Sequence, residues 1–155
     1  QMNDKGMIID ESHLSDGGFW DCIRYSRAPI AASHSNARML CRHPRNLTDE
    51  MLHALGEKGG VAGVNFYSPF LREKGRAQLA DLVLHIRHMV NCAGEDAVAL
   101  GSDFDGFDPA DCPEGAGSVL DVGKVFSSLK KNGFTQRQIE KIARDNVRRL
   151  IEDTW

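Results

Sequence analysis

Histidine, aspartate and asparagine side chains recur in this sequence at or directly after short apolar runs. The set comprises His13, His34, Asn65, Asp103 and Asp105. Neutral imidazoles and carboxylates are the groups with which hydrolases hold zinc. These residue types therefore indicate hydrolytic chemistry at a metal centre. A hydrogen-bonded loop histidine, and a plain Asp–Gly turn at residues 101–106, stay open as alternatives.

Arg45 lies in a basic loop at residues 38–45, close to His43. An arginine does not bind a metal ion, but its planar guanidinium matches a carboxylate in a bidentate geometry. The loop therefore offers a group that could hold a substrate carboxylate, with a solvated arginine as the alternative.

Two further histidines, His85 and His88, lie three residues apart in an expected helix. That spacing could hold a metal ion because it puts both rings on one helix face. No third ligand is near them in the sequence, so we expect surface or packing roles for both.

The apolar runs alternate with segments of helical periodicity. Short strands are expected at residues 7–10, 29–33, 61–66 and 97–101. Helices are expected at residues 16–27, 48–58, 78–93, 118–131 and 135–153. Apolar strands joined by helices imply a parallel sheet covered by helices, which is an α/β fold. The carboxyl ends of parallel strands share one edge, so the polar residues should converge there.

Both a doubly wound sheet and a (β/α) barrel fit this order of elements. The glycine fingerprint of a dinucleotide site and the P-loop are both absent after the first strand. A complete eight-unit barrel needs roughly 200–250 residues. Four strand–helix units in 155 residues therefore amount to half of one.

Composition excludes several other classes of protein. The net charge of −3 provides no basic surface for phosphates, so no nucleic-acid partner is expected. No apolar run approaches the ~18 residues of a membrane span. The four cysteines are widely spaced without a C-x-x-C pair, which favours free thiols in a reducing compartment. Localisation itself stays open, with the cytoplasm favoured.

Several separate motifs resemble the membrane (renal) dipeptidase family of zinc peptidases, peptidase family M19. The motifs are SH at residues 12–13, SHSNAR at 33–38, PRN at 44–46, GVAGVNFY at 60–67, GSDFDG at 101–106 and DNVRR at 145–149. Their order and spacing are kept over nearly the whole chain. The resemblance implies that residues 1–155 form the C-terminal half of a (β/α)8 TIM barrel. That half comprises about four βα units plus a terminal helix, and the N-terminal half is absent.

The resemblance also implies a cofactor of two zinc ions per complete site, bridged by a carboxylate and by a water or hydroxide. His13 and His34 match the two histidines that hold one zinc ion. The family's first-strand His-x-Asp pair, its bridging glutamate and a further histidine would lie upstream of this chain. Only part of the ligand set is therefore expected here.

The remaining roles follow from the same resemblance. Arg45 matches the arginine that grips the terminal carboxylate of a dipeptide substrate. Asp103 matches the catalytic acid/base that passes a proton to the leaving amine. Asp105 and Asn65 are candidates for supporting these groups. The implied reaction is attack of the metal-bridging hydroxide on the peptide carbonyl.

The isolated chain is expected to be inactive without its missing half. The expected partners are a dipeptide, that N-terminal half or a second copy of the chain, with a homo-oligomer as a possible state. Two alternatives stay open. One is a different amidohydrolase-type metal-dependent barrel, although no lysine follows any expected strand. The other is a non-catalytic half-barrel module that pairs with a partner half.

Overall fold

The computed structural model describes residues 1–155 as a four-stranded parallel sheet with helices on both sides. The strands are β1 (Ile9–Asp10), β2 (Ile30–Ala32), β3 (Val61–Val64) and β4 (Val98–Leu100). They lie side by side in chain order, with Ile9 opposite Ile30 and Ala31 opposite Val61. The predicted α/β class is confirmed, and each strand is shorter than the run that predicted it.

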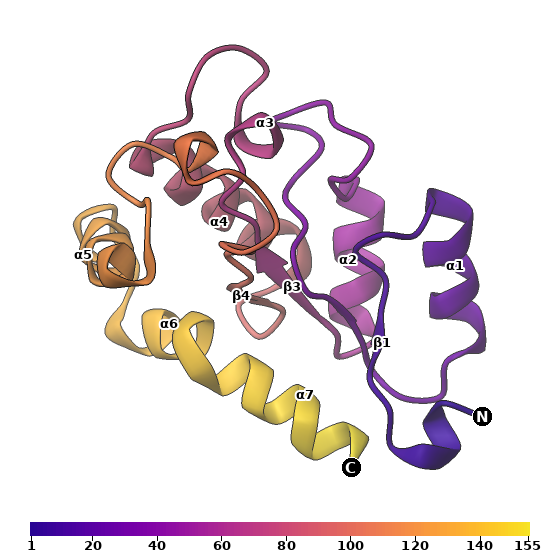
Figure 1. The fold of residues 1–155 in the computed structure, drawn as a ribbon. Helices are drawn as coiled ribbons and strands as arrows, with labels where there is room; N and C mark the ends of the chain where they lie inside the picture. The colour runs from indigo at the N-terminus through magenta and orange to yellow at the C-terminus, as the bar shows by residue number, and fades with distance from the viewer.

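The main core lies between one face of the sheet and the helices α1 (Asp16–Tyr25), α2 (Asp49–Glu57) and α4 (Leu79–Ala93). These helices pack on the same side in Figure 1. Ile30, Ala62 and Val98 point from the sheet into this core, where they meet Leu52 and Ile86. Such burial of apolar side chains is the main stabilising term of the fold.

The other elements are short or irregular. They are η1 (Asn3–Lys5), α3 (Ser68–Leu71), η2 (Pro109–Asp111), η3 (Val119–Asp121), α5 (Val122–Lys131), α6 (Gln136–Glu140), η4 (Lys141–Asp145) and α7 (Asn146–Thr154). The helix expected at 118–131 begins with the 3₁₀ turn η3. The single helix expected at 135–153 is interrupted by η4, which is a π-helical turn. The short helix α3, which begins around a proline, was not expected from the sequence.

The helix α7 closes the amino-terminal edge of the sheet, and it crosses the lower part of Figure 1. Leu150 packs against the sheet residues Ala31, Val61 and Ala99, on the face away from the main core. Arg149 Nη1 donates a hydrogen bond of 2.8 Å to the carbonyl oxygen of Gly59, just before β3. Side-chain contacts to backbone thus fasten this helix where the strands begin.

Close backbone packing at the opposite edge depends on glycine. A Cβ atom at Gly63 or at Gly101 would clash with the carbonyl oxygen of Ser33. The carboxyl ends of β2, β3 and β4 therefore approach one another more closely than side chains would allow. The strands β1 and β4 each have only one neighbour, so both edges of the sheet are open. None of the helices is long and apolar enough to cross a membrane.

Candidate active site

The two candidate metal ligands, His13 and His34, meet at the carboxyl edge of the sheet. His13 lies in the loop after β1 and His34 in the loop after β2, and their Nε2 atoms are 3.0 Å apart. The convergence expected from the parallel strand order is therefore present for this pair.

A chain of hydrogen bonds fixes which nitrogen of His34 is free. The Ser33 hydroxyl donates to Oδ2 of Asp10 at 2.5 Å, so its oxygen is left to accept from Nδ1–H of His34 at 2.7 Å. The His34 backbone is held too, because its N–H donates to the Ser12 hydroxyl at 2.9 Å. This arrangement leaves Nε2 of His34 without a proton and directed at His13. Such support is typical of metal-binding histidines.

The charges around His34 favour its neutral form. Burial lowers the pKa of His34, and the carboxylates of Asp103 and Asp10 oppose that shift without reversing it. Burial also tends to raise the pKa of Asp10, but hydrogen bonds from Ser33 and Ser12 hold that pKa below its usual value. An ionised Asp10 and a neutral His34 are the states in which imidazole can bind a metal ion.

Arg45 reaches the histidine pair from the loop after β2. Its Nε donates to the carbonyl oxygen of Ser12 at 2.7 Å, and its Nη2 donates to Nε2 of His34 at 3.2 Å. Its guanidinium carbon also lies 5.6 Å from the centre of the Phe70 ring. The guanidinium is thus held beside the histidines by backbone and aromatic contacts, in a position to meet an anionic group.

Asp103 and Asn65 form the second part of the site, at the ends of β4 and β3. Asn65 Nδ2 donates to Oδ2 of Asp103 at 3.0 Å. The Asp103 backbone has a φ of 65°, a left-handed conformation that non-glycine residues rarely adopt. A Cβ atom at Gly106 would meet the Asp103 carboxylate, so the carboxylate keeps this position only while residue 106 has no side chain. Asp105 is exposed in the same turn and makes no hydrogen bond with the other candidates.

Asn36 is a supporting residue that the sequence analysis did not single out. It is fully buried, its Oδ1 accepts from the Asn65 N–H at 2.8 Å, and its Nδ2 donates to the Asn65 carbonyl oxygen at 3.0 Å. The roles of Asp10 and Ser33 were missed as well. A serine directly before a strand-end histidine, beside an aspartate on the neighbouring strand, is the signal that could have found them.

Glu11, which was also not expected from the sequence, places a buried carboxyl group beside the site. It is 3% exposed, and its Oε1 atom has no hydrogen-bond partner. Burial, followed by repulsion from Asp10, raises the pKa of Glu11 to about 7, against the opposing effect of Arg45. Its carboxyl group therefore keeps its proton more readily than an exposed glutamate does.

The histidine pair fits the geometry of a zinc site. Two nitrogens bound to one tetrahedral zinc ion at ~2.05 Å lie about 3.3 Å apart, close to the 3.0 Å observed between the two Nε2 atoms. Two imidazoles are only part of a ligand set, because zinc in hydrolases takes at least three protein ligands. Further ligands have to come from outside these two loops.

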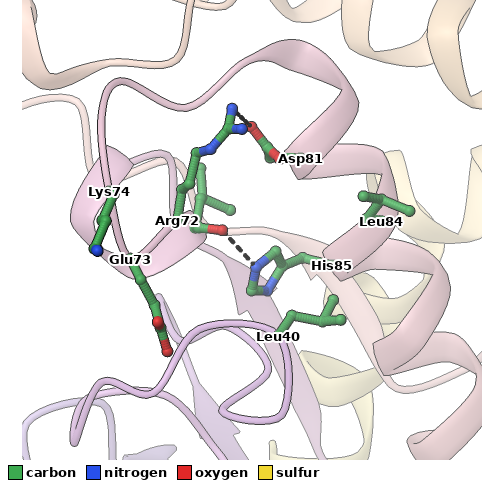
Figure 2. Close-up of a pocket in the computed structure, with 8 residues that line it drawn as sticks. Leu40, Arg72, Glu73, Lys74, Asp81, Leu84 and His85 are labelled. Atoms are coloured by element: carbon green, nitrogen blue, oxygen red, sulfur yellow. Dashed lines mark hydrogen bonds and ion pairs between the residues drawn. The ribbon is translucent and has the colours of Figure 1, made fainter.

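A separate pocket lies away from this site, beside α4 (Figure 2). It has a volume of about 560 Å³. Arg72 reaches toward Asp81 across it, and the ring of His85 lies at its base, hydrogen bonded through Nε2 to the Leu71 carbonyl oxygen at 3.1 Å. Nδ1 of His85 accepts from the Ala37 N–H at 3.1 Å. His85 thus has the packing role that was predicted.

The fold defines an α/β class of protein that gathers histidine, asparagine and aspartate side chains at the carboxyl ends of its parallel strands. The family model for membrane dipeptidases (peptidase family M19) matches residues 1–154. The chain therefore belongs to this family of metallo-dipeptidases. The family expected from the sequence motifs is confirmed.

Known proteins show the same relationship. An uncharacterized protein in the pqqA 5′ region of Klebsiella pneumoniae is 41% identical over an alignment of 159 residues, which covers 100% of this chain and 58% of the relative. An uncharacterized dipeptidase of Schizosaccharomyces pombe is 38% identical, covering 99% of this chain and 37% of its own. A metallopeptidase from Rhodobacter sphaeroides, solved with a phosphinate mimic of the dipeptide L-Ala-D-Ala, superposes with a TM-score of 0.93 at 34% identity. That match covers 99% of this chain and 44% of the other, so this chain spans about half the length of its relatives.

Proposed function

We propose that this chain supplies one half of the active site of a zinc-dependent dipeptidase. The observation that carries the proposal is the pair of Nε2 atoms 3.0 Å apart, with the guanidinium of Arg45 against one of them. Two metal ligands beside the fixed guanidinium of Arg45 suit a substrate that has a carboxylate close to its scissile bond, as a dipeptide does.

Each residue has a distinct part in the proposed reaction. His13 and His34 hold one zinc ion through Nε2. Zinc supplies Lewis-acid activation of the peptide carbonyl and of a water molecule. Arg45 binds the terminal carboxylate and so orients the substrate. Asp103, positioned by Asn65, carries a proton to the leaving amine.

We further propose that residues 1–155 form the C-terminal half of a (β/α)8 barrel. The open edges of β1 and β4 support this, because unpaired strand edges favour pairing with further strands. The pairing partner is an N-terminal half, or a second copy of this chain, and it supplies the remaining zinc ligands.

The decisive experiment combines the chain with the N-terminal half of a family member, such as the R. sphaeroides metallopeptidase. Dipeptide hydrolysis and bound zinc are measured for the chain alone and for the combination. We expect activity and about stoichiometric zinc only in the combination. A rate for the isolated chain equal to that of a whole family enzyme would contradict the proposal.

Arg45 provides a more specific check within the same preparation. Arg45→Lys removes the bidentate fork, so KM for dipeptides should rise at least about tenfold. Arg42→Lys is the matched control, because Arg42 is exposed in the same loop. Equal effects of the two substitutions would show that Arg45 does not hold the carboxylate.

The open strand edges also favour a second candidate, a non-catalytic half-barrel module. Gel filtration combined with zinc analysis separates the two functions. A zinc-free, stable dimer of the chain would support the module, whereas zinc held by His13 and His34 in a reconstituted barrel would support the dipeptidase. An amidohydrolase-type barrel with another substrate would hold zinc but leave dipeptides intact.

A further inference from the structure

The candidate active site at the carboxyl edge of the sheet, with His13, His34 and Asp103, is called the mouth below. A second cluster of potential metal-ligand side chains lies outside it, between α2 and α4. It consists of Asp49, His88 and Cys92, whose ligand atoms all lie within 4.8 Å of one another. Nε2 of His88 is 2.7 Å from Oδ1 of Asp49 and 3.5 Å from Sγ of Cys92. We call these three residues the interhelical cluster.

The helices hold this cluster in a fixed arrangement. Asp49 is the first residue of α2, which begins where the Thr48 hydroxyl accepts from the Met51 N–H. His88 and Cys92 are four residues apart on α4, so they lie on one face of that helix. A Cβ atom at Gly56 would clash with the backbone of Ala93, so α2 and α4 pack backbone against backbone. The three donors therefore come from a close and rigid helix contact.

The geometry is wrong for a nucleophilic triad. In such a triad the carboxylate binds one ring nitrogen and the nucleophile binds the other. Here Asp49 and Cys92 both approach the same nitrogen, Nε2 of His88. Without a metal ion, His88 pairs with Asp49 and the Cys92 thiol hydrogen-bonds to the same carboxylate, so all three side chains already face one another. An oxygen, a nitrogen and a sulfur ligand atom that converge on one point are the arrangement that a metal ion requires.

We propose that the interhelical cluster binds a divalent transition metal, with Zn²⁺ as the best fit. Thiolate, imidazole and one carboxylate suit zinc and cobalt and disfavour Mg²⁺ or Ca²⁺. A zinc ion with bonds of ~2.3 Å to sulfur and ~2.05 Å to nitrogen puts these atoms about 3.5 Å apart, the distance observed between Cys92 and His88. The carboxylate has to move away from Nε2 by about 0.6 Å to reach the separation of two ligands on one ion.

Solvent access completes the site. The side chains of His88 and Asp49 are 23% and 40% exposed, so an ion can enter and a water molecule can take the fourth position. Burial, followed by the charge of Asp49, raises the pKa of the Cys92 thiol. The thiol is therefore protonated in the metal-free protein. On binding, the sulfur–metal bond replaces the S–H bond and the proton passes to solvent.

The test uses cobalt, because a thiolate bound to Co²⁺ gives a charge-transfer absorption in the near ultraviolet that imidazole and carboxylate ligands do not give. The mouth contains no cysteine among its candidate ligands, so this band distinguishes metal at the interhelical cluster from metal at the mouth. Titration of the chain with Co²⁺ should produce the band with a stoichiometry of one. Zinc added afterwards should abolish it by competition.

Matched variants decide the assignment. Cys92→Ser should remove the band, and His88→Asn should weaken cobalt binding at least about tenfold. Cys22→Ser is the control, because Cys22 is also a free, half-buried cysteine but lies on α1. It should leave the band unchanged. A wild-type chain without the band, or a band that survives in Cys92→Ser, would overturn the proposal.

The outcome is independent of the proposed dipeptidase site. The double variant His13→Asn/His34→Asn should keep the thiolate band, even though it loses the candidate ligands of the mouth. Thermal unfolding gives a second measurement, because a metal bound only to the folded state raises Tm. Zinc should raise Tm in this double variant and should have no such effect once Cys92→Ser is added to it.

Discussion

At the scale of single residues, Ser33 decides which nitrogen of His34 faces the mouth. Its hydroxyl group donates a hydrogen bond to Asp10, so its oxygen accepts one from Nδ1–H of His34. Arg45 can only donate, and it donates to Nε2 of the same ring. Both contacts require the tautomer with the proton on Nδ1. The polar neighbours of His34 thus hold its ring in the tautomer that a metal ligand would need.

Replacing Ser33 with alanine should release this constraint. In the metal-free chain we expect ¹⁵N NMR of the imidazole ring to show His34 with its proton on Nδ1, and Ser33→Ala to show a mixture of tautomers. Metal affinity should fall by about 10- to 100-fold, as for other supporting contacts of histidine ligands. Ser127→Ala is the control, since that hydroxyl is exposed on α5. An unchanged tautomer in Ser33→Ala would contradict the assigned role.

The candidate residues of the mouth were predictable because parallel strands share a carboxyl edge. His13 and His34 could be paired in this way from strand order alone. The order Ser33–His34 beside Asp10 carried a signal for supporting contacts, but which atoms meet depends on side-chain directions that the sequence does not specify. The interhelical cluster was missed for a related reason: Asp49 is 39 residues from His88 in sequence and meets it only through helix packing.

At the scale of elements, close strand packing shapes the mouth. Gly63 on β3 and Gly101 after β4 both face the Ser33 carbonyl oxygen, with no room for a Cβ atom. A side chain at either position would force apart the loops that carry His34 and Asp103.

Gly63→Ala should therefore be strongly destabilising, by about 3 kcal/mol, because the clash is with backbone and no side chain can rotate away. Gly123→Ala provides the matched control, because a Cβ atom there meets nothing within 4 Å. It should stabilise α5 by about 0.5 kcal/mol. Urea unfolding of the two variants measures both effects, and similar stabilities would refute the close approach.

The anchor of α7 gives another prediction at this scale. Asn146 is buried, and its Nδ2 donates to the carbonyl oxygens of Glu95 and Val98 at 2.9 Å and 2.8 Å. Asn146→Ala leaves both carbonyls without this donor and should cost about 2 kcal/mol of unfolding free energy. Asn132→Ala, at an exposed helix end, should change stability by less than about 0.5 kcal/mol. Chemical denaturation measures the free energy of unfolding of both variants, and equal losses in the two would contradict this role of Asn146.

Helix periodicity predicted most elements, but it could not predict how α6 and α7 are joined. A π-helical turn widens the backbone between them, a feature that depends on packing against β4. The four-residue α3 was missed because one helical turn is too short to show periodicity.

At the scale of the whole molecule, stability should depend on the protonation of His85. Burial lowers the pKa of His85 to about 4, and the Ala37 N–H occupies its Nδ1. The unfolded chain binds a proton near pH 6.5, whereas the folded chain binds it only near pH 4. The unfolded state therefore holds more protons in this window, so the free energy of unfolding should fall as the pH drops from 6.5 to 4. The contribution of this residue is about 3 kcal/mol.

Comparison with His85→Gln isolates this contribution from those of other groups. Wild type and variant are unfolded in urea at several pH values, and the slope of stability against pH is compared rather than its absolute value. We expect a shallower slope in the variant between pH 6.5 and 4. NMR titration of His85 in the wild type gives the pKa directly, and a value near 6.5 would contradict the prediction.

The carboxyl rim of the sheet, where the strands end, and the amino rim, where they begin, differ in function. Candidate catalytic groups occupy the loops after the strands, whereas α7 fastens the strands where they begin. For directed evolution, this division makes the molecule modular. Exposed residues of the 33–47 and 101–117 loops, such as Met39 and Arg42, can be randomised in search of new substrates, while Asn146 and Arg149 hold α7 against the sheet. Libraries confined to the carboxyl rim should hence retain far more folded members than libraries of equal size at the amino rim.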